Sequence, residues 1–376
     1  MNKIMAVGAL TLVALGGCAQ DHNVTGLAAD RALELNASAV AAADAPGAVY
    51  ALTNVAGGNA VAMYSRGADG RLSWSGSVST GGAGTGASLG SQGALALSDD
   101  GRWLFAVNAG SNDVSAFRVT PRGIELTGRV ASGGIRPISV TVHGDVLYVL
   151  NAGGDGNISG FRVGNDGALA PLAGSTRPLS GSGVGPAQVA FSPTGAWLVV
   201  TEKTTNRLDI YAVGSDGLVS GVNTAASAGG TPFGFAFGHR DELFVSEAAG
   251  SASSYIVGTA GLTVASGAVL THQGAPCWAV VTENGRYGYT ANAQGGSISG
   301  FAIASDGSIN LIDGDGRTAV VGGGNIDLAV SGNSRYLYEL NGNRSISGFR
   351  IEADGHLTTV GNVAGLPAST VGLVAR

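Results

Sequence analysis

Short apolar segments alternate with polar turns along most of this chain. Residues 103–107 form an apolar run of strand type, residues 108–112 are typical of a turn, and residues 114–119 alternate apolar with small or polar residues, as a half-buried strand does. Weaker strand patterns at 94–97 and 124–130 flank this hairpin. The pattern predicts a sheet of four short antiparallel strands, which cannot bury both of its faces without neighbouring sheets of the same kind.

This pattern recurs at intervals of about 45 residues, the period of propeller blades. The motif Ile-Ser-Gly-Phe, or a close variant, occupies the third strand of four copies, at residues 114–117, 158–161, 298–301 and 346–349. An Asp-Gly turn leads into the fourth strand of most copies. The last residues of the predicted second strands are Asn54, Asn108, Asn151, Glu202, Glu247, Asn292 and Asn341. Several features in one register therefore predict seven blades.

The first copy lacks an opening strand, and the end of the chain supplies a candidate. Residues 47–53 already resemble a second strand, whereas residues 370–375 have the first-strand pattern of residues 186–191. A C-terminal strand in the first blade would close the ring and remove exposed sheet edges. We therefore predict an all-β fold over residues 47–376: a seven-bladed β-propeller of four-stranded antiparallel blades, closed by the C-terminal strand.

The segment before residue 47 has a different character. Residues 1–17 carry one charge, Lys3, and an apolar run that is too short to span a bilayer and is typical of an export signal. The run ends in Leu-Gly-Gly-Cys18, which resembles a bacterial lipobox, so Cys18 is the expected lipidation site. An ordinary cleavage site with a chance cysteine is the alternative. We predict a lipoprotein signal peptide at 1–17, a tether at 18–46, and a periplasm-facing or outer-membrane lipoprotein of the bacterial cell envelope.

Composition agrees with a propeller and excludes some functions. The 64 glycines suit tight turns and crowded inner strands. A formal net charge of −6 without lysine clusters argues against nucleic acid, and the lipid anchor is the one expected contact with the membrane. The five histidines are scattered and no ligand spacing occurs, so we expect no metal and no cofactor, in a monomer. If Cys18 carries lipid, Cys277 has no disulfide partner.

A candidate site follows from the topology of an up-and-down blade. The first strand begins and the second strand ends at the same mouth of the channel. Glu202 and Glu247 stand there in a ring otherwise made of asparagine, and Lys203 is one of only two lysines in the chain. We expect Glu202 or Glu247 to act as the general base and Lys203 as the donor to a developing oxyanion. The expected ligand-binding residues on the first strands are Gln188, Trp278, Asp327 and Ser139.

Structural roles explain the same residues and stay open at this point. Asparagines at strand ends cap turns. Glu202 and Lys203 can pair with surface neighbours, and Trp278 can belong to the core between blades. Cys277 can be a small buried hydrophobe, because no histidine lies in register to activate it.

The repeats resemble those of a known family. The segments at 69–72, 147–151 and 192–195 are similar to the seven-bladed lactonase family, which includes bacterial 6-phosphogluconolactonases and fungal carboxymuconate cyclases, and also to YVTN-type repeats. The resemblance covers about residues 47–376 and implies a seven-bladed propeller. For activity, it implies lactone hydrolysis.

The family's functional residues are not retained. Where members have a His-rich first strand, this chain has Pro137-Ile138-Ser139, and where they have Gly-Pro-Arg-His it has Gly-Pro-Ala-Gln188. Their Asn-Glu pair is replaced by Glu202-Lys203. The usual acid, base and anion-binding groups are therefore missing, and a phosphorylated substrate is not expected.

Two functions remain. The first is a lipid-anchored propeller that binds, and as an enzyme would hydrolyse, a small lactone or sugar-derived ligand at the channel mouth. The second is a non-catalytic envelope propeller that contacts protein or polysaccharide partners. Loss of the family's catalytic pattern favours the second, whereas the carboxylates at the mouth keep the first open.

Overall fold

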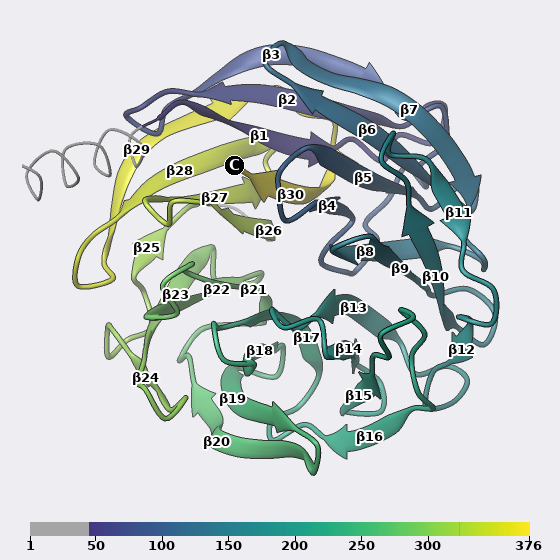
Figure 1. The fold of residues 1–376 in the computed structure, drawn as a ribbon. Coiled ribbons are helices and arrows are strands. Elements are labelled where there is room, and N and C mark those ends of the chain that lie inside the picture. The colour runs from purple at the N-terminus through teal and green to yellow at the C-terminus, as the bar shows by residue number, and fades with distance from the viewer. Residues whose placement is uncertain (1–44, 323) are drawn as a thin grey trace, which may run out of the picture. The chain divides into compact units, whose positions relative to one another are not determined.

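The computed structural model describes residues 45–322 and 324–376, so the predicted signal peptide, Cys18 and most of the tether lie outside the described residues. Residues 45–376 form one compact unit in which seven β-sheets are arranged in a ring (Figure 1). The described residues contain no helix that could cross a membrane. The predicted all-β, seven-bladed fold is confirmed.

Each blade lists its strands from the channel outward. The first blade contains β30 (Val371–Ala375), β1 (Gly47–Leu52), β2 (Ala60–Arg66) and β3 (Leu72–Ser79). The second contains β4 (Leu95–Leu97), β5 (Trp103–Asn108), β6 (Asp113–Thr120) and β7 (Gly123–Ala131). The third contains β8 (Pro137–His143), β9 (Val146–Asn151), β10 (Asn157–Val163), β11 (Leu169–Pro171) and β12 (Arg177–Pro178).

The remaining four blades follow the same order. The fourth contains β13 (Pro186–Phe191), β14 (Trp197–Glu202), β15 (Arg207–Ala212) and β16 (Asn223–Ala226). The fifth contains β17 (Pro232–Phe237), β18 (Glu242–Glu247), β19 (Ser251–Gly258) and β20 (Gly261–Leu270). The sixth contains β21 (Pro276–Val281), β22 (Tyr287–Asn292), β23 (Ser297–Ile303), β24 (Ile309–Leu311) and β25 (Ala319–Val320). The seventh contains β26 (Asn325–Val330), β27 (Tyr336–Asn341), β28 (Ser345–Ile351) and β29 (Leu357–Ala364).

The C-terminal strand closes the ring as predicted. Strand β30 pairs antiparallel with β1, with Val374 opposite Tyr50. Arg376 continues the ladder, because its amide donates to the Ala48 carbonyl at 2.9 Å and its carbonyl accepts from the Ala48 amide at 3.2 Å. The Arg66 guanidinium also donates to the Arg376 carbonyl, at 3.2 Å from Nη2. The first blade therefore joins the two ends of the propeller domain.

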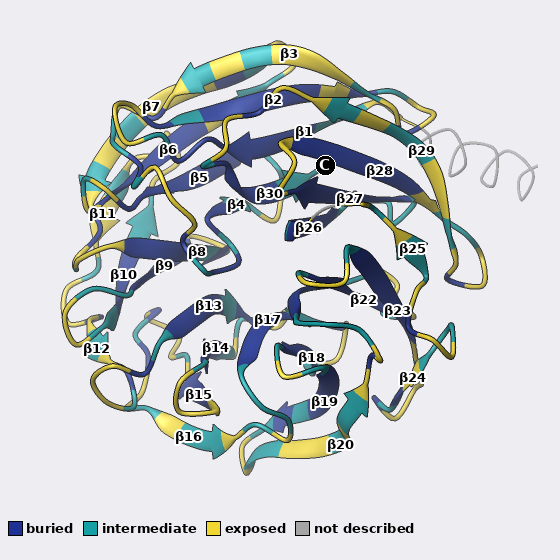
Figure 2. Ribbon diagram, turned by 180° about the vertical axis from the view of Figure 1, so that it is seen from behind, coloured by how far each residue is buried: buried dark blue, intermediate teal, exposed yellow. Residues whose placement is uncertain are grey.

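Burial explains why the second strands are almost continuously apolar. Strands β5, β9, β22 and β27 are buried at every position, because adjacent blades cover both of their faces (Figure 2). The outer strands β3 and β29 have no buried position and alternate between exposed and half-buried residues. A strand covered on both faces has no polar face, whereas a strand at the rim needs one.

The repeated Asp-Gly turn packs against the second strand of the preceding blade. Gly70 has a positive φ of 81°, and a Cβ there would lie 2.3 Å from the Tyr336 ring, so a side chain is excluded by both conformation and contact. The Tyr338 hydroxyl donates to the Gly70 carbonyl at 2.7 Å. The Tyr148 and Tyr289 hydroxyls make the same bond to Gly217 (3.0 Å) and Gly355 (2.8 Å).

The outer strands of the third and sixth blades differ from the single strand that the repeat predicts. Strands β11 and β12 both pair with β10, and β24 and β25 both pair with β23. Pro171 ends the first of these pieces, because it has no amide hydrogen for the ladder. In the sixth blade Gly316 has a positive φ of 72°, which turns the chain between the two pieces.

We expect removal of residues 366–376 to abolish cooperative unfolding or to lower the melting midpoint by about 10 °C or more, because it strips β1 of its inner partner and opens a sheet edge. Calorimetry of the truncated and full-length proteins measures this. Cooperative melting of the truncated protein at the wild-type midpoint would show that β30 is not needed to close the ring.

Candidate functional site

A glycine-rich segment between the first two blades, residues 80–93, crosses the mouth at which the second strands end. Gln92 donates from Nε2 to the Ala279 carbonyl on β21 at 2.7 Å and accepts from the Ala279 amide at 2.9 Å. Its own amide donates to the Ala187 carbonyl on β13 at 3.1 Å. This plug segment therefore connects the inner strands of the fourth and sixth blades. Sequence analysis missed it, because a glycine- and serine-rich stretch has no apolar periodicity.

Trp278, an expected ligand-binding residue, lies beneath the plug segment. Its Nε1 donates to the Ser91 carbonyl at 3.0 Å, and the Ser91 hydroxyl donates to the Ile138 carbonyl on β8 at 2.9 Å. The Trp278 ring packs edge-on against Phe233, with centroids 5.3 Å apart, and the residue is only 8% exposed. Trp278 thus packs the channel interior and offers a ligand little surface.

Glu202, an expected base, faces into its own blade. Its carboxylate accepts hydrogen bonds from the Ser180 amide at 3.1 Å, the Ser180 hydroxyl at 2.5 Å and the Thr205 hydroxyl at 2.6 Å. The side chain is 0% exposed. A general base has to reach the proton that it abstracts. This placement therefore gives no support to that role.

Glu247 lies in a similar closed network and is also 0% exposed. Its Oε1 accepts from the Ser227 hydroxyl at 3.0 Å, the Gly229 amide at 2.7 Å and the Ser253 hydroxyl at 2.6 Å. Its Oε2 accepts from the Ser251 hydroxyl at 2.5 Å. These four donors satisfy the buried carboxylate and leave it no route to a ligand.

The asparagines at the same ring positions point the same way. Asn292 donates from Nδ2 to Ser297 at 3.0 Å and to Ser299 at 2.9 Å, both on the third strand of its blade. Asn341 and Asn108 bond to third-strand side chains in the same manner. The ring is therefore a set of strand-end nodes, each a buried side chain that ties the second strand to the third.

Gln188 and Ser139, two further expected ligand-binding residues, connect neighbouring inner strands. Gln188 donates to the Phe235 carbonyl at 3.0 Å and accepts from the Phe235 amide at 2.7 Å. The Ser139 hydroxyl accepts from the Val189 amide at 3.1 Å. Both side chains are engaged with backbone, so their observed role is to hold adjacent blades together.

Asp327 makes the equivalent contact at the ring closure. Its carboxylate accepts from the Leu328 amide at 2.8 Å and from the Leu373 amide on β30 at 3.0 Å. Complete burial raises the pKa of Asp327 well above its usual range, although the two amide donors oppose the shift. Asp327 thus contacts the backbone of the closing strand.

Lys203 is placed differently, because it lines an open depression. Its Nζ donates to the Gly90 carbonyl of the plug segment and lies 5.0 Å from the centroid of the Phe233 ring. Burial lowers the pKa of Lys203, and the nearby Arg136 guanidinium lowers it further. Burial also raises the pKa of the Cys277 thiol to about 12, which leaves it protonated and unreactive.

The depression has a volume of about 300 Å³ and lies between the plug segment and the third and fourth blades. Lys203, Arg136 and Asp155 line it together with backbone at Gly154 and Gly183. Arg136 and Asp155 are exposed, and neither forms an ion pair with a described residue. Two cations and one carboxylate therefore face the same space.

Sequence analysis missed Arg136 and Asp155. One signal was available for Asp155: the connection from β9 to β10 runs over residues 152–156, one residue longer than the connection at 109–112 in the second blade. Arg136 is held in the left-handed region, with a φ of 56°, and its amide donates to the Asn112 side chain at 2.7 Å. No local pattern announces that conformation in a residue other than glycine.

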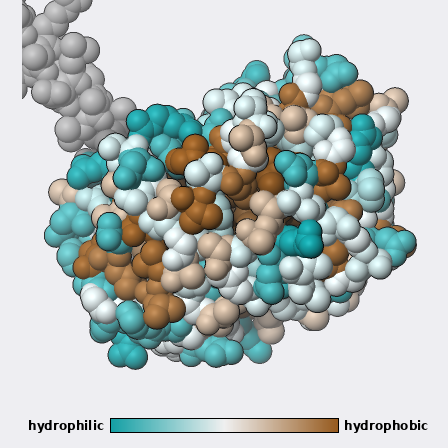
Figure 3. All heavy atoms as spheres, turned by 90° about the horizontal axis from the view of Figure 1, so that it is seen from below, coloured by the Kyte–Doolittle hydropathy of each residue, from teal (hydrophilic) through white to brown (hydrophobic). Residues whose placement is uncertain are grey.

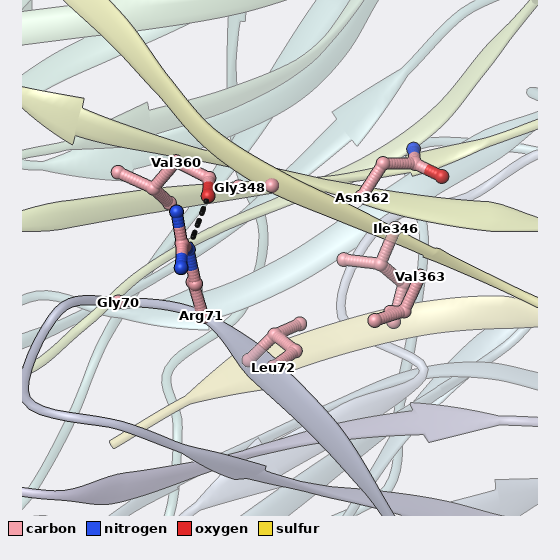
Figure 4. Close-up of a pocket in the computed structure, with 9 residues that line it drawn as sticks. Gly70, Arg71, Leu72, Ile346, Gly348, Val360, Asn362 and Val363 are labelled. Atoms are coloured by element: carbon pink, nitrogen blue, oxygen red, sulfur yellow. Dashed lines mark hydrogen bonds between the residues drawn. The ribbon is translucent and has the colours of Figure 1, made fainter.

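A second cavity, of about 110 Å³, lies between the seventh and first blades (Figure 4). Glycine and aliphatic residues form most of its lining, and Arg71 donates from Nε to the Val360 carbonyl at 3.2 Å. This cavity offers no acid or base. Among residues 45–322 and 324–376, no group of three or more His, Cys, Asp or Glu side chains is placed to hold a metal ion.

Comparison with known proteins supports the family expected from the repeats. Residues 48–180 match the model of a family described as "Lactonase, 7-bladed beta-propeller". The chain resembles the seven-bladed lactonase family. No curated protein matches this lactonase-like propeller in sequence.

Three solved structures show the breadth of the fold. A periplasmic gluconolactonase from Pseudomonas aeruginosa has a TM-score of 0.70 at 18% identity, over 88% of this chain and 99% of its own. A candidate 6-phosphogluconolactonase from Bacteroides fragilis has a TM-score of 0.69 at 18% identity, over 88% and 98%. A hypothetical selenium-binding protein from Sulfolobus tokodaii has a TM-score of 0.64 at 12% identity, over 88% and 94%. At such identities the likeness concerns the fold, and Lys203 lies outside the matched residues 48–180.

The plug segment gives a direct test of the channel geometry. We expect Gln92→Ala to lower the free energy of unfolding by about 1–3 kcal/mol, because it leaves the buried Ala279 amide and carbonyl without partners. Urea unfolding measures the change, and Ser88→Ala, at an exposed position of the same segment, is the control. Equal stability of the two variants would argue against this role for Gln92.

Proposed function

We propose that this lactonase-like propeller binds a small lactone or sugar-derived ligand in the depression beside Lys203 and opens lactones there. The observation that carries the proposal is the joint presence of Lys203, Arg136 and Asp155 around one space of about 300 Å³. Lactone opening needs a base for water and donors for the oxyanion. These three side chains are of the required types.

The roles follow from the charges. Asp155 takes a proton from water, whose oxygen adds to the lactone carbonyl carbon. Lys203 and Arg136 donate hydrogen bonds to the carbonyl oxygen as negative charge develops. The ring C–O bond then breaks, and the proton held by Asp155 returns to the ring oxygen, which leaves as a hydroxyl. The product carboxylate lies beside the two cations, whose charges it neutralises.

A second candidate function is a non-catalytic envelope propeller with a protein or polysaccharide partner. The closed networks around Glu202 and Glu247 favour it, because neither carboxylate is free for catalysis. The surface gives it less support. Large exposed hydrophobic residues are spread over five blades, and Figure 3 shows apolar side chains interspersed with polar ones. They are Trp74, Leu126, Ile135, Val264, Leu270 and Val320.

A panel of five- and six-membered sugar lactones tests the activity. We expect hydrolysis by the wild-type protein and a fall in kcat/KM of about 10²-fold or more in Lys203→Met and Asp155→Asn, because each removes a group that acts in the transition state. Arg122→Met, at an exposed position in the turn between β6 and β7, is the matched control. Full activity in Lys203→Met would contradict the proposed site, and no turnover of any lactone would favour the non-catalytic candidate.

Binding can be tested separately, because Lys203 is the only lysine beyond residue 3. Reductive methylation with ¹³C-formaldehyde gives that side chain its own NMR signal, which Lys203→Met identifies by its loss. A sugar acid or lactone that binds in the depression is expected to shift this signal. Ligands that bind without shifting it occupy another site.

We further propose that the protein is a lipoprotein of the bacterial cell envelope, anchored through Cys18. The motif Leu-Gly-Gly-Cys18 supports this proposal, and it lies outside the described residues. In a bacterial host supplied with radioactive palmitate, we expect the wild-type chain to incorporate label and to partition into detergent, and Cys18→Ser to do neither. Equal labelling of the variant would overturn the lipid anchor.

A further inference from the structure

The strand-end node of the fourth blade differs from those of its neighbours. In the sixth and seventh blades an asparagine bonds to two serines, and in the fifth blade Glu247 bonds to serines. In the fourth blade Glu202 meets Asp209 on β15, so two carboxyl groups share one node. Both residues are 0% exposed.

One amide holds the two carboxyl groups together. The Ser180 amide donates to Glu202 Oε1 and to Asp209 Oδ2, at 3.1 Å in each case. The Ser180 hydroxyl donates to Glu202 Oε2 at 2.5 Å. Asp209 Oδ1 receives no hydrogen bond from the described residues, so a proton shared between the two carboxyl groups supplies the missing donor.

No cation neutralises this pair. Arg207 is the charged group on the same strand, but it is exposed and its Nη1 donates to the Thr224 hydroxyl at 3.0 Å. The Tyr211 hydroxyl donates to the Pro178 carbonyl at 3.1 Å, and burial raises its pKa further, so it stays neutral. Burial, followed by the adjacent Glu202, raises the pKa of Asp209 to about 8.

The node lies directly under the candidate depression. Ser180 begins the stretch 181–185, which supplies part of the lining. The Lys203 amide donates to the Gly185 carbonyl at 3.0 Å, and the Thr204 amide to the Val184 carbonyl at 3.0 Å. The Thr205 hydroxyl donates to Glu202 at 2.6 Å. The carboxyl pair therefore holds both the wall of the depression and the turn that carries Lys203.

We propose that Glu202 and Asp209 are positioning residues for the depression, and that loss of their shared proton loosens the wall at 181–185 and the Lys203 turn in alkaline solution. This switch rests on the proposed function only for what the depression binds. The physical cause is the burial of a second negative charge beside the first, with no cation to offset it.

The direction of the pH dependence follows from linkage. The folded chain keeps a proton on the pair that the unfolded chain, with an ordinary aspartate, has already released. The free energy of unfolding due to this group therefore falls as the pH rises from the ordinary aspartate pKa towards about 8. Above that value the pair is doubly ionised, and each further pH unit favours the loosened wall by up to about tenfold until the wall has opened.

Hydrogen–deuterium exchange of the whole protein tests the switch without a ligand. We expect protection factors at residues 181–185 and 203–206, corrected for intrinsic rates, to fall about fivefold or more between pH about 6.5 and pH about 9. Asp209→Ser, which gives the fourth blade the serine of its neighbours, is expected to remove this pH response. Glu247→Gln, which alters a node with one carboxylate, is expected to keep it.

Wild-type protection that does not change with pH would overturn the proposal, as would an equal response in Asp209→Ser. If Asp209→Ser does not fold, Asp209→Asn keeps the side-chain size and carries the same expectation. Because exchange needs no substrate, failure of the switch and failure of lactone hydrolysis are separate outcomes. If both hold, Asp209→Ser also removes the fall in lactone binding at high pH.

Discussion

The propeller depends on the contact between a second-strand aromatic side chain and the Asp-Gly turn of the next blade. The glycine has to be bare, because a Cβ at Gly70 would overlap the Tyr336 ring, and its carbonyl accepts the Tyr338 hydroxyl. The same contact recurs between other blades and again at the closure between the seventh blade and the first. Closure by β30 therefore adds a strand to an interface of the type used elsewhere in the ring.

Buried polar side chains at the strand ends follow from the same architecture. A blade covered on both faces leaves no water for a polar group, so each group has to find a protein partner. Glu247 finds four donors, and Gln188 and Asp327 find backbone of the neighbouring inner strand. Carboxylates at the channel mouth are thus consistent with structure alone. Chemistry is left to groups that packing does not use.

The plug segment determines which groups remain. By occupying the channel through Gln92 it confines ligand access to the space beside it, between the third and fourth blades. It also holds Lys203 through the Gly90 carbonyl, close to Phe233. The one lysine of the propeller is therefore half-buried and unpaired with any carboxylate, next to Arg136. Two neighbouring cations favour an anionic or strongly polar ligand.

The strands, the seven repeats and the closing strand were predictable, because period-two patterns and Asp-Gly turns are local signals of strands and their connections. Lys203 was recognisable by its rarity. The directions of Glu202 and Glu247 were not predictable, since a side chain at a strand end turns towards whichever donors the folded ring brings near it, here Ser180 and Ser251. The plug and the meeting of Arg136, Asp155 and Lys203 were likewise decided by tertiary structure, because they join residues from different blades that share no local pattern.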